Sequence, residues 1–152
     1  MTEAGARVQE LLERIATEAG VDAHVEVRED EDGILGEFVG GDLGLLIGHH
    51  GQTLDAIQHL AYRIAFSGEG ARKQVSVDAA GYRERRAVAL RAAADQAAEA
   101  AVHDRRPVPL EAAMNALERK VVHEHLKSRH DVETYSEGQE PSRRVVVAPL
   151  VD

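Results

Sequence analysis

Apolar residues early in the chain recur with the period of a helix. Residues 4–19 predict an amphipathic helix, because apolar residues follow helical spacing at Val8, Leu11, Leu12 and Ile15. Gly20 follows, and glycine commonly ends a helix. We therefore expect a helix that buries one face against the rest of the domain.

The next two segments alternate apolar and polar residues, which is the period of half-buried strands. They cover residues 21–28 and 34–39. Between them, Asp32-Gly33 supplies the positive φ angle that tight hairpin turns require. We therefore expect an antiparallel hairpin.

A short apolar turn, a glycine loop and a second amphipathic helix come next. The turn covers residues 43–47, the loop is at 48–51, and the helix begins near Gln52. The apolar positions of this helix are Leu54, Ile57, Leu60, Ala61 and Ile64. The glycine-rich stretch 67–70 ends the helix, and residues 72–79 then alternate like a strand. The first half thus predicts helix, strand, strand, short helix, loop, helix and strand.

The second half is predicted to hold two helices and two strands. An alanine-rich helix covers residues 82–102, and a second helix extends from about Pro109 to about Leu126. The apolar face of the second helix is assigned to Leu110, Ala113, Leu117 and Val121. Strands are predicted at 132–135 and 143–148, with a polar loop between them.

The composition argues against several classes of protein. The chain has no cysteine, which excludes a disulfide framework and a thiolate metal site. No apolar stretch is long enough to span a bilayer, and the first twenty residues lack the pattern of a signal peptide. No Walker loop, metalloprotease helix or dinucleotide fingerprint is present, so we do not expect an enzyme. We expect a cytoplasmic protein that needs no cofactor.

The formal net charge of -9 is unevenly distributed. Residues 1–46 contain 12 of the 27 acidic residues but only 3 of the 18 lysines and arginines, so the rest of the chain is neutral overall. The basic residues near the start of the long helix are Arg83, Arg85, Arg86 and Arg91. The acids available to pair with them on that helix are Glu84, Asp95 and Glu99. The arginines either face a phosphate backbone or pair with these acids, and both interpretations stay open here.

The loop Gly48-His49-His50-Gly51 has the chemistry of a phosphate-binding turn. Glycine has no Cβ, so the backbone can approach a ligand closely. The N–H groups at the start of the following helix, near Gln52, face the loop, and a helix N-terminus attracts phosphate oxygens. Histidine has an ordinary pKa of roughly 6.5, so these side chains add little fixed charge near neutral pH. A metal site is not expected, because adjacent side chains diverge and no third ligand is evident.

The segment 46–58, set in this order of helices and strands, resembles a KH domain of the prokaryotic, type II arrangement. The resemblance implies an α+β fold of helix, strand, strand, helix, helix and strand. It also implies that residues 48–51 clamp the backbone of single-stranded nucleic acid, with bases in an adjacent apolar groove. Ile47 and Leu54 would then help to wall that groove. The two histidines depart from the family, whose loops commonly carry Lys or Arg. The alternative, a tight turn without a ligand, is weakened by the complete order of elements around the loop.

A second pattern lies further along the chain. Arg119 and His123 are four positions apart, which places them on one face of the predicted helix. With the segments 132–138 and 143–147, they resemble the R-3-H domain, a small α/β fold associated with single-stranded nucleic acid. The resemblance implies that both residues contact phosphate or sugar, and we expect Arg144 to help from a neighbouring strand.

A KH domain followed by an R-3-H domain resembles the Jag (SpoIIIJ-associated) family of bacterial RNA-binding proteins, over residues 4–149. We expect a KH domain at 1–80, a connecting helix at 81–104 that sets the spacing of the two sites, and an R-3-H domain at 105–152. The candidate binding residues are Ile47, Gly48, His49, His50, Gly51, Gln52, Leu54, Arg119, His123, Arg143 and Arg144. Family members often carry a further N-terminal domain, which we do not expect in this chain.

The resemblance implies single-stranded RNA as the ligand, with single-stranded DNA as the other option. It also implies self-association or a second small KH protein as a partner, and a role in regulation after transcription that is linked to the cell envelope or to division. The rival hypothesis is a protein-interaction module with little nucleic-acid binding of its own. A nucleic-acid binder should lose affinity steeply with salt, whereas such a module should not bind nucleic acid saturably.

Overall fold

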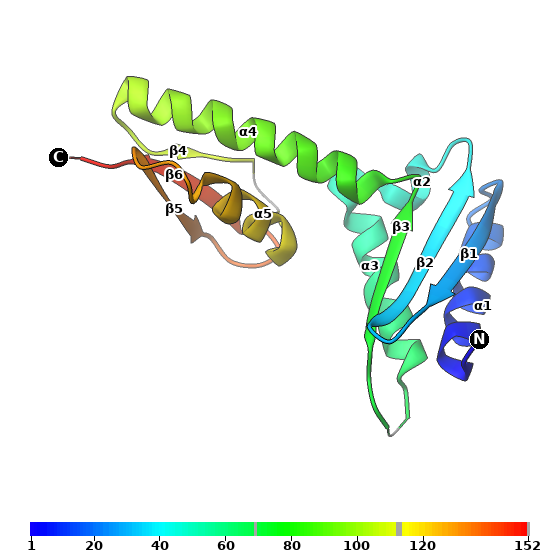
Figure 1. Ribbon diagram of the computed structural model, residues 1–152. Coiled ribbons are helices and arrows are strands. Elements are labelled where there is room, and N and C mark those ends of the chain that lie inside the picture. The colour runs from blue at the N-terminus through cyan, green and yellow to red at the C-terminus, as the bar shows by residue number, and fades with distance from the viewer. Residues whose placement is uncertain (69, 112–113, 152) are drawn as a thin grey trace. The chain divides into compact units, whose positions relative to one another are not determined.

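The computed structural model of the protein describes residues 1–68, 70–111 and 114–151 (Figure 1). It separates into two units, Met1–Arg83 and Glu84–Asp152. In the described part of the chain, no helix is long and apolar enough to cross a membrane.

The first unit has the predicted order of elements. These are α1 (Glu3–Glu18), β1 (Ala23–Glu29), β2 (Gly33–Gly40), α2 (Gly44–Ile47), a 3-10 turn η1 (His49–Gly51), α3 (Gln52–Ala65) and β3 (Gln74–Ala79). The sheet order is β1-β2-β3, with β1 antiparallel to β2 and β2 parallel to β3. This arrangement confirms the α+β fold expected from the resemblance to a type II KH domain.

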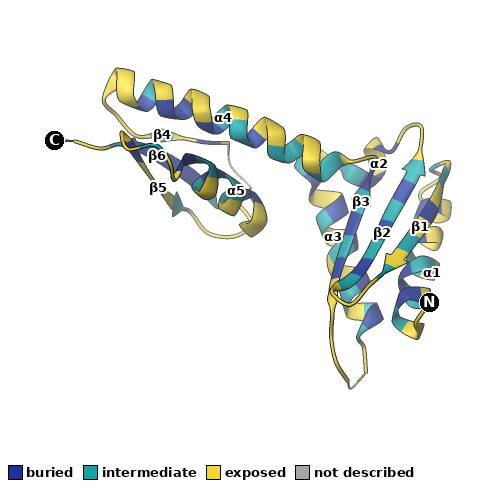
Figure 2. Cartoon of the chain, viewed as in Figure 1, coloured by how far each residue is buried: buried dark blue, intermediate teal, exposed yellow. Residues whose placement is uncertain are grey.

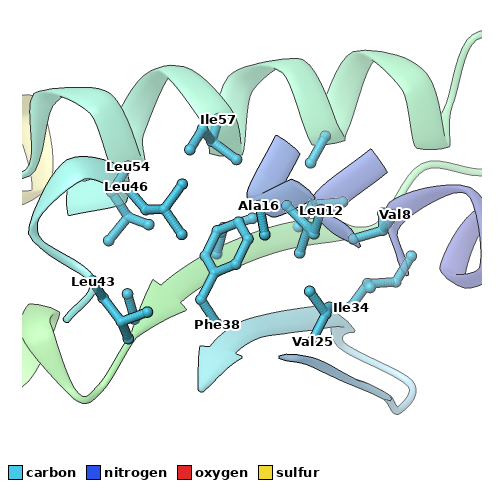
Figure 3. Close-up of a cluster of buried hydrophobic side chains, with 14 of the residues drawn as sticks. Val8, Leu12, Ala16, Val25, Ile34, Phe38, Leu43, Leu46, Leu54 and Ile57 are labelled. Carbon is cyan, nitrogen blue, oxygen red and sulfur yellow. The ribbon is translucent and has the colours of Figure 1, made fainter. Parts of the chain in front are cut away.

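The core of the first unit lies between the sheet and the helices α1 and α3. The alternation of β2 places Ile34 and Phe38 on the buried face, where they meet Val8 and Leu12 of α1 (Figure 3). Leu12 and Phe38 are fully buried. This packing fixes the position of α3, and with it the end of the glycine loop.

The predicted apolar face of α3 differs from the buried one at two positions. The buried residues are Leu54, Ile57, Ala61 and Ala65, whereas Leu60 is 45% exposed and Ile64 is only half-buried. At about 100° of rotation per residue, Leu60 lies off the stripe that these four residues form.

The second unit combines two helices with a small antiparallel sheet. Its elements are α4 (Tyr82–Asp104), which begins in the first unit, β4 (Val108–Pro109), α5 (Ala116–Leu126), β5 (Val132–Glu137) and β6 (Arg144–Pro149). The strand order is β4-β6-β5. Helix α4 has one buried face (Figure 2), formed by Leu90, Ala94, Ala97, Ala98 and Ala101. The alanines of this helix therefore belong to the core of the second unit.

The start of α5 differs from the sequence prediction. The helix begins at Ala116 rather than near Pro109, which lies in β4. Asn115 caps the helix: its side chain accepts from the N–H of Glu118 at 2.8 Å, and the Glu118 carboxylate accepts from the N–H of Asn115 at 3.0 Å. Strand β4 lies at an edge of its sheet. Proline is tolerated in an edge strand, although it has no N–H to donate.

The buried face of α5 also differs from the prediction. Its buried residues are Glu118, Val122 and Leu126, and Leu117 is 61% exposed. Leu110 is buried but precedes the helix, and Ala113 lies outside the described residues. Val122 is buried, and the predicted Val121 is half-buried against the core, so the observed face is offset from the predicted one.

Candidate nucleic-acid interface

The glycine loop has backbone angles that favour glycine. Gly48 has φ 73° and ψ −172°, a region that essentially only glycine adopts. A Cβ on Gly48 would lie 2.2 Å from Thr53 Oγ1. Gly51 has φ 78° and is buried, and a Cβ there would lie 2.6 Å from Tyr82 Cε1. Both glycines are thus required for the close turn between α2 and α3.

The N-terminus of α3 lies directly behind this turn. Gly51 is the N-cap and makes no side-chain cap hydrogen bond, and Gln52 follows as an exposed first residue. The N–H of Gln52 donates to the carbonyl of His49. The N–H groups that follow it in the first turn have no partner within the helix, so they can donate to an anion. The structure therefore provides the backbone arrangement that the loop sequence predicts.

The two loop histidines lie together rather than apart. Their ring centroids are 3.9 Å apart and the rings are tilted by 30°. His50 has φ 52° and is half-buried, whereas His49 is exposed. The expectation that the two side chains diverge was therefore wrong, because the left-handed backbone at His50 turns its ring toward its neighbour. In the described part of the chain, no group of three or more acidic or histidine side chains is placed to hold a metal ion.

The two predicted groove residues differ in burial. Leu54 has no exposed surface and points into the core beside Leu46 and Phe38 (Figure 3). Ile47 is half-buried and packs against the same core. Leu54 therefore supports the loop from within the core, and only Ile47 of this pair reaches the surface.

A hollow between α3 and β3 was not found from the sequence. It is lined by Asp55, Gln58, His59, Tyr62, Gln74 and Val75. Its lining includes more polar groups than the predicted apolar groove. Helix α3 starts at the glycine loop and also lines the hollow, so the loop and the hollow lie along one helix.

Arg83 and Gln58 close the edge of β3 beside this hollow. Arg83 donates from Nε to the carbonyl of Val77 at 2.8 Å, from Nη1 to Asp55 at 2.8 Å and from Nη2 to Gln58 at 3.0 Å. Gln58 Oε1 also accepts from the N–H of Val77 at 2.9 Å. Side chains thus satisfy both backbone groups of Val77, which protects the strand edge.

The arginines at the start of α4 mostly pair with acids, but mainly not with the predicted ones. Arg83 binds Asp55, and Arg86 binds Glu118 at 2.6 Å. The pair of Arg91 and Glu84, at 3.3 Å, matches the prediction. The other two acids bind elsewhere in the second unit, Asp95 to His125 and Glu99 to Arg129. The paired arginines therefore stabilise the fold.

His123 is held between two hydroxyl groups of β5. Its Nδ1 lies 2.7 Å from Thr134 Oγ1 and its Nε2 lies 3.1 Å from Ser136 Oγ. Burial lowers the pKa of His123 below its ordinary value, and the charge of nearby Arg119 lowers it further. At neutral pH the ring is therefore uncharged, with one nitrogen donating and the other accepting.

Arg119 lies one turn before His123 and is largely covered. Its side chain is 12% exposed. Nη1 donates to the carbonyl of Met114 at 2.5 Å, and Nη2 lies 2.8 Å from Glu140 Oε1. The helix spacing thus brings Arg119 and His123 together as predicted, but an acidic side chain already contacts the guanidinium.

Arg143 and Arg144 do not join this pair as expected. Arg143 Nη1 donates to the carbonyl of Gly138 at 2.6 Å. Arg144 pairs with Glu137 across the sheet, with Nη2 3.1 Å from its carboxylate. Consecutive residues of a strand point to opposite faces of the sheet. His123 contacts Ser136, whereas Arg144 is paired with the next residue, Glu137. Arg144 is therefore on the other face of the sheet and does not assist His123.

The lowered pKa of His123 predicts a loss of stability in acid. The unfolded chain binds a proton near the ordinary pKa of about 6.5, whereas the folded chain resists protonation until a lower pH. The stabilising contribution is complete above about pH 6.5 and is lost as the pH falls toward the folded-state pKa. Chemical denaturation between about pH 7.5 and 5.5 should show a larger loss in the wild type than in His123→Gln. An equal loss in both proteins would contradict this assignment.

Two family models match the chain. The model described as the KH domain of KhpA/KhpB matches residues 6–78, and that of the R-3-H domain matches residues 88–149. The chain is therefore a KH domain followed by an R-3-H domain, the class that the glycine loop and the Arg119–His123 pair indicate.

Three curated relatives share this arrangement, each named "RNA-binding protein KhpB". The protein of Clostridium symbiosum is 36% identical over 91% of this chain, that of Lactiplantibacillus plantarum 38% over 88%, and that of Bacillus subtilis 32% over 90%. The matched regions cover 63%, 41% and 66% of these relatives, so the chain spans only part of their length. The chain belongs to the KhpB, or Jag, family. None of these family models or relatives carries the name of an enzyme.

Proposed function

We propose that this chain binds single-stranded nucleic acid, RNA in preference to DNA, through two surfaces. The first is the loop 48–51 with the start of α3, and the second is the Arg119–His123 pair. The observation that carries the proposal is the backbone of Gly48, whose φ of 73° and ψ of −172° are a glycine-only conformation. Gly48 ends α2 and opens the turn that leads to the N-terminus of α3, where the N-cap Gly51 makes no side-chain cap hydrogen bond.

The loop supplies donors rather than charge. Backbone N–H groups at the start of α3 bind phosphate oxygens, and the exposed ring of His49 hydrogen-bonds or stacks on a base. The polar hollow beside α3 offers Gln58 and His59 to base edges. A surface with so little fixed charge binds weakly alone, because counterion release contributes most of the affinity for a phosphate backbone.

The second surface adds a permanent cation. Arg119 carries its charge at all physiological pH values and binds phosphate, while neutral His123 contributes hydrogen bonds. Two weak sites on one chain raise each other's effective concentration for the same strand. The relatives are named as RNA-binding proteins, which favours RNA.

We further propose a cytoplasmic role in regulation after transcription, connected with the cell envelope or with division as in the family. The proposed partner is a second copy of this chain or a second small KH protein.

Fluorescence anisotropy with short single-stranded RNA and DNA tests this proposal. Arg119→Ala should weaken RNA binding by about tenfold, because a charged hydrogen bond to phosphate is lost. The double change His49→Asp/His50→Asp should weaken it at least as much by placing two carboxylates against the phosphates. The matched control is His24→Asp/His103→Asp, which makes the same charge change at two exposed histidines outside the loop. Affinity should also fall as salt is raised.

The outcomes separate the two hypotheses for the chain. Loss of affinity in Arg119→Ala and in the loop variant, but not in the control, supports two nucleic-acid surfaces. Unchanged affinity in both site variants would show that the assignments are wrong. Absence of saturable binding by the wild type would instead favour the protein-interaction module.

A further inference from the structure

The loop between β5 and β6 brings a carboxylate onto the guanidinium that the proposed function assigns to phosphate. Glu140 Oε1 lies 2.8 Å from Arg119 Nη2. The arginine side chain is 12% exposed and the glutamate side chain is 60% exposed. The carboxylate therefore covers the cation from the solvent side, where a phosphate would have to approach.

The geometry of this contact resembles that of a bound phosphate. A carboxylate and a phosphate each offer oxygen acceptors to the guanidinium, and charged hydrogen bonds of this kind are the strong ones. Arg119 is also held from below, because Nη1 donates to the carbonyl of Met114 at 2.5 Å. The guanidinium would thus keep its orientation if the carboxylate left.

The loop that carries Glu140 is organised by its own hydrogen bonds. The N–H of Ser142 donates to the carbonyl of Gln139 at 2.8 Å, and Arg143 Nη1 donates to the carbonyl of Gly138 at 2.6 Å. The carbonyl of Arg143 in turn accepts from the N–H of Met114 at 2.9 Å. These bonds join the loop to Met114, whose carbonyl accepts from Arg119. The loop thus holds Glu140 beside the guanidinium of Arg119.

We propose that Glu140 is a built-in competitor that occupies Arg119 in the free protein and must be displaced when a phosphate of single-stranded nucleic acid binds. This inference rests on the proposed function of Arg119. It assigns Glu140 the role of setting the affinity. Salt that screens the exposed carboxylate also screens the phosphate, so the two ligands compete on similar terms. Displacement costs little, because an ion pair with one exposed partner is weak.

The test compares Glu140→Gln with Glu133→Gln in fluorescence anisotropy with a single-stranded RNA. Glu133 is an exposed acid of β5, so its replacement changes the net charge equally without touching Arg119. Glu140→Gln should bind about two- to fivefold more tightly than the wild type, which corresponds to the loss of a weak ion pair. Glu133→Gln should bind with nearly unchanged affinity. Thermal unfolding of both variants checks that the fold is retained.

The same pair of changes is then made in an Arg119→Ala background. There the gain from Glu140→Gln should vanish, because the cation for which the carboxylate competes is gone. A gain equal to that of Glu133→Gln, a gain that persists without Arg119, or weaker binding by Glu140→Gln would each overturn the inference. If the wild type binds no RNA, the proposed function fails and takes the inference with it. If Arg119→Ala weakens binding but Glu140→Gln brings no gain, the inference alone fails.

Discussion

Gly48→Ala should weaken the binding of single-stranded RNA by tenfold or more while leaving most of the protein folded. Alanine cannot readily adopt the φ of 73° and ψ of −172° found here, a conformation that costs a non-glycine residue about 1–3 kcal/mol. Its Cβ would also lie 2.2 Å from Thr53 Oγ1 at the start of α3. The loop must therefore rearrange, and the N–H groups of α3 lose their alignment with the phosphate. Anisotropy gives the affinity and circular dichroism gives the stability.

Gly41→Ala is the matched control for this change. Gly41 is exposed and nothing lies within 4 Å of the position that its Cβ would occupy. It should bind RNA like the wild type. If Gly48→Ala binds with wild-type affinity and wild-type stability, the loop does not form the nucleic-acid site.

Glu118→Ala should destabilise the second unit by about 3 kcal/mol, because it breaks a buried ion pair and leaves a charge without its partner. Glu118 is 9% exposed, and its carboxylate accepts from Arg86 Nε at 2.6 Å and from the N–H of Asn115 at 3.0 Å. Arg86 Nη2 is buried without a hydrogen-bond partner in the described part of the chain, so the guanidinium depends on this one carboxylate. The helix that carries Arg119 also loses its capping box.

Urea denaturation measures this loss, and Glu84→Ala provides the comparison. Glu84 pairs with Arg91 at 3.3 Å, but its side chain is 77% exposed. Its replacement should therefore cost less than about 1 kcal/mol. Equal costs for the two variants would show that the pair of Glu118 and Arg86 is not a main support of the second unit.

The order of helices and strands could be predicted because it depends on local periods. Alternation along β1 and β2 and the helical spacing in α1 identified these elements within a few residues. The period does not say which apolar residue is buried when several lie near the edge of a stripe, so Leu60 and Leu117 were misplaced. The start of α5 has a local signal in the Asn115-x-x-Glu118 capping box, whereas Pro109 upstream also fits a first helical turn and predicts an earlier start.

The candidate sites were predictable only in part. Arg119 and His123 meet because helical spacing alone brings them together, and the glycine loop follows from the conformational freedom of glycine. Their partners come from distant parts of the chain: Arg83 finds Asp55 across 28 positions, and Arg86 finds Glu118 across 32. Such pairs are set by tertiary packing, for which a single sequence holds no spacing rule. For the same reason, the sequence does not predict the contact of Glu140 with Arg119 or the placement of Arg144 on the other face of the sheet.

The most direct test of the central claim, that both domains contact one nucleic acid, is a titration of the ¹⁵N-labelled protein with a single-stranded RNA long enough to reach both. We expect saturable chemical-shift changes in the amides of residues 48–52 and in the Nε–H signal of Arg119, with the same apparent affinity at both places. Changes confined to other surfaces, such as the sheet face that carries Arg144, would contradict it.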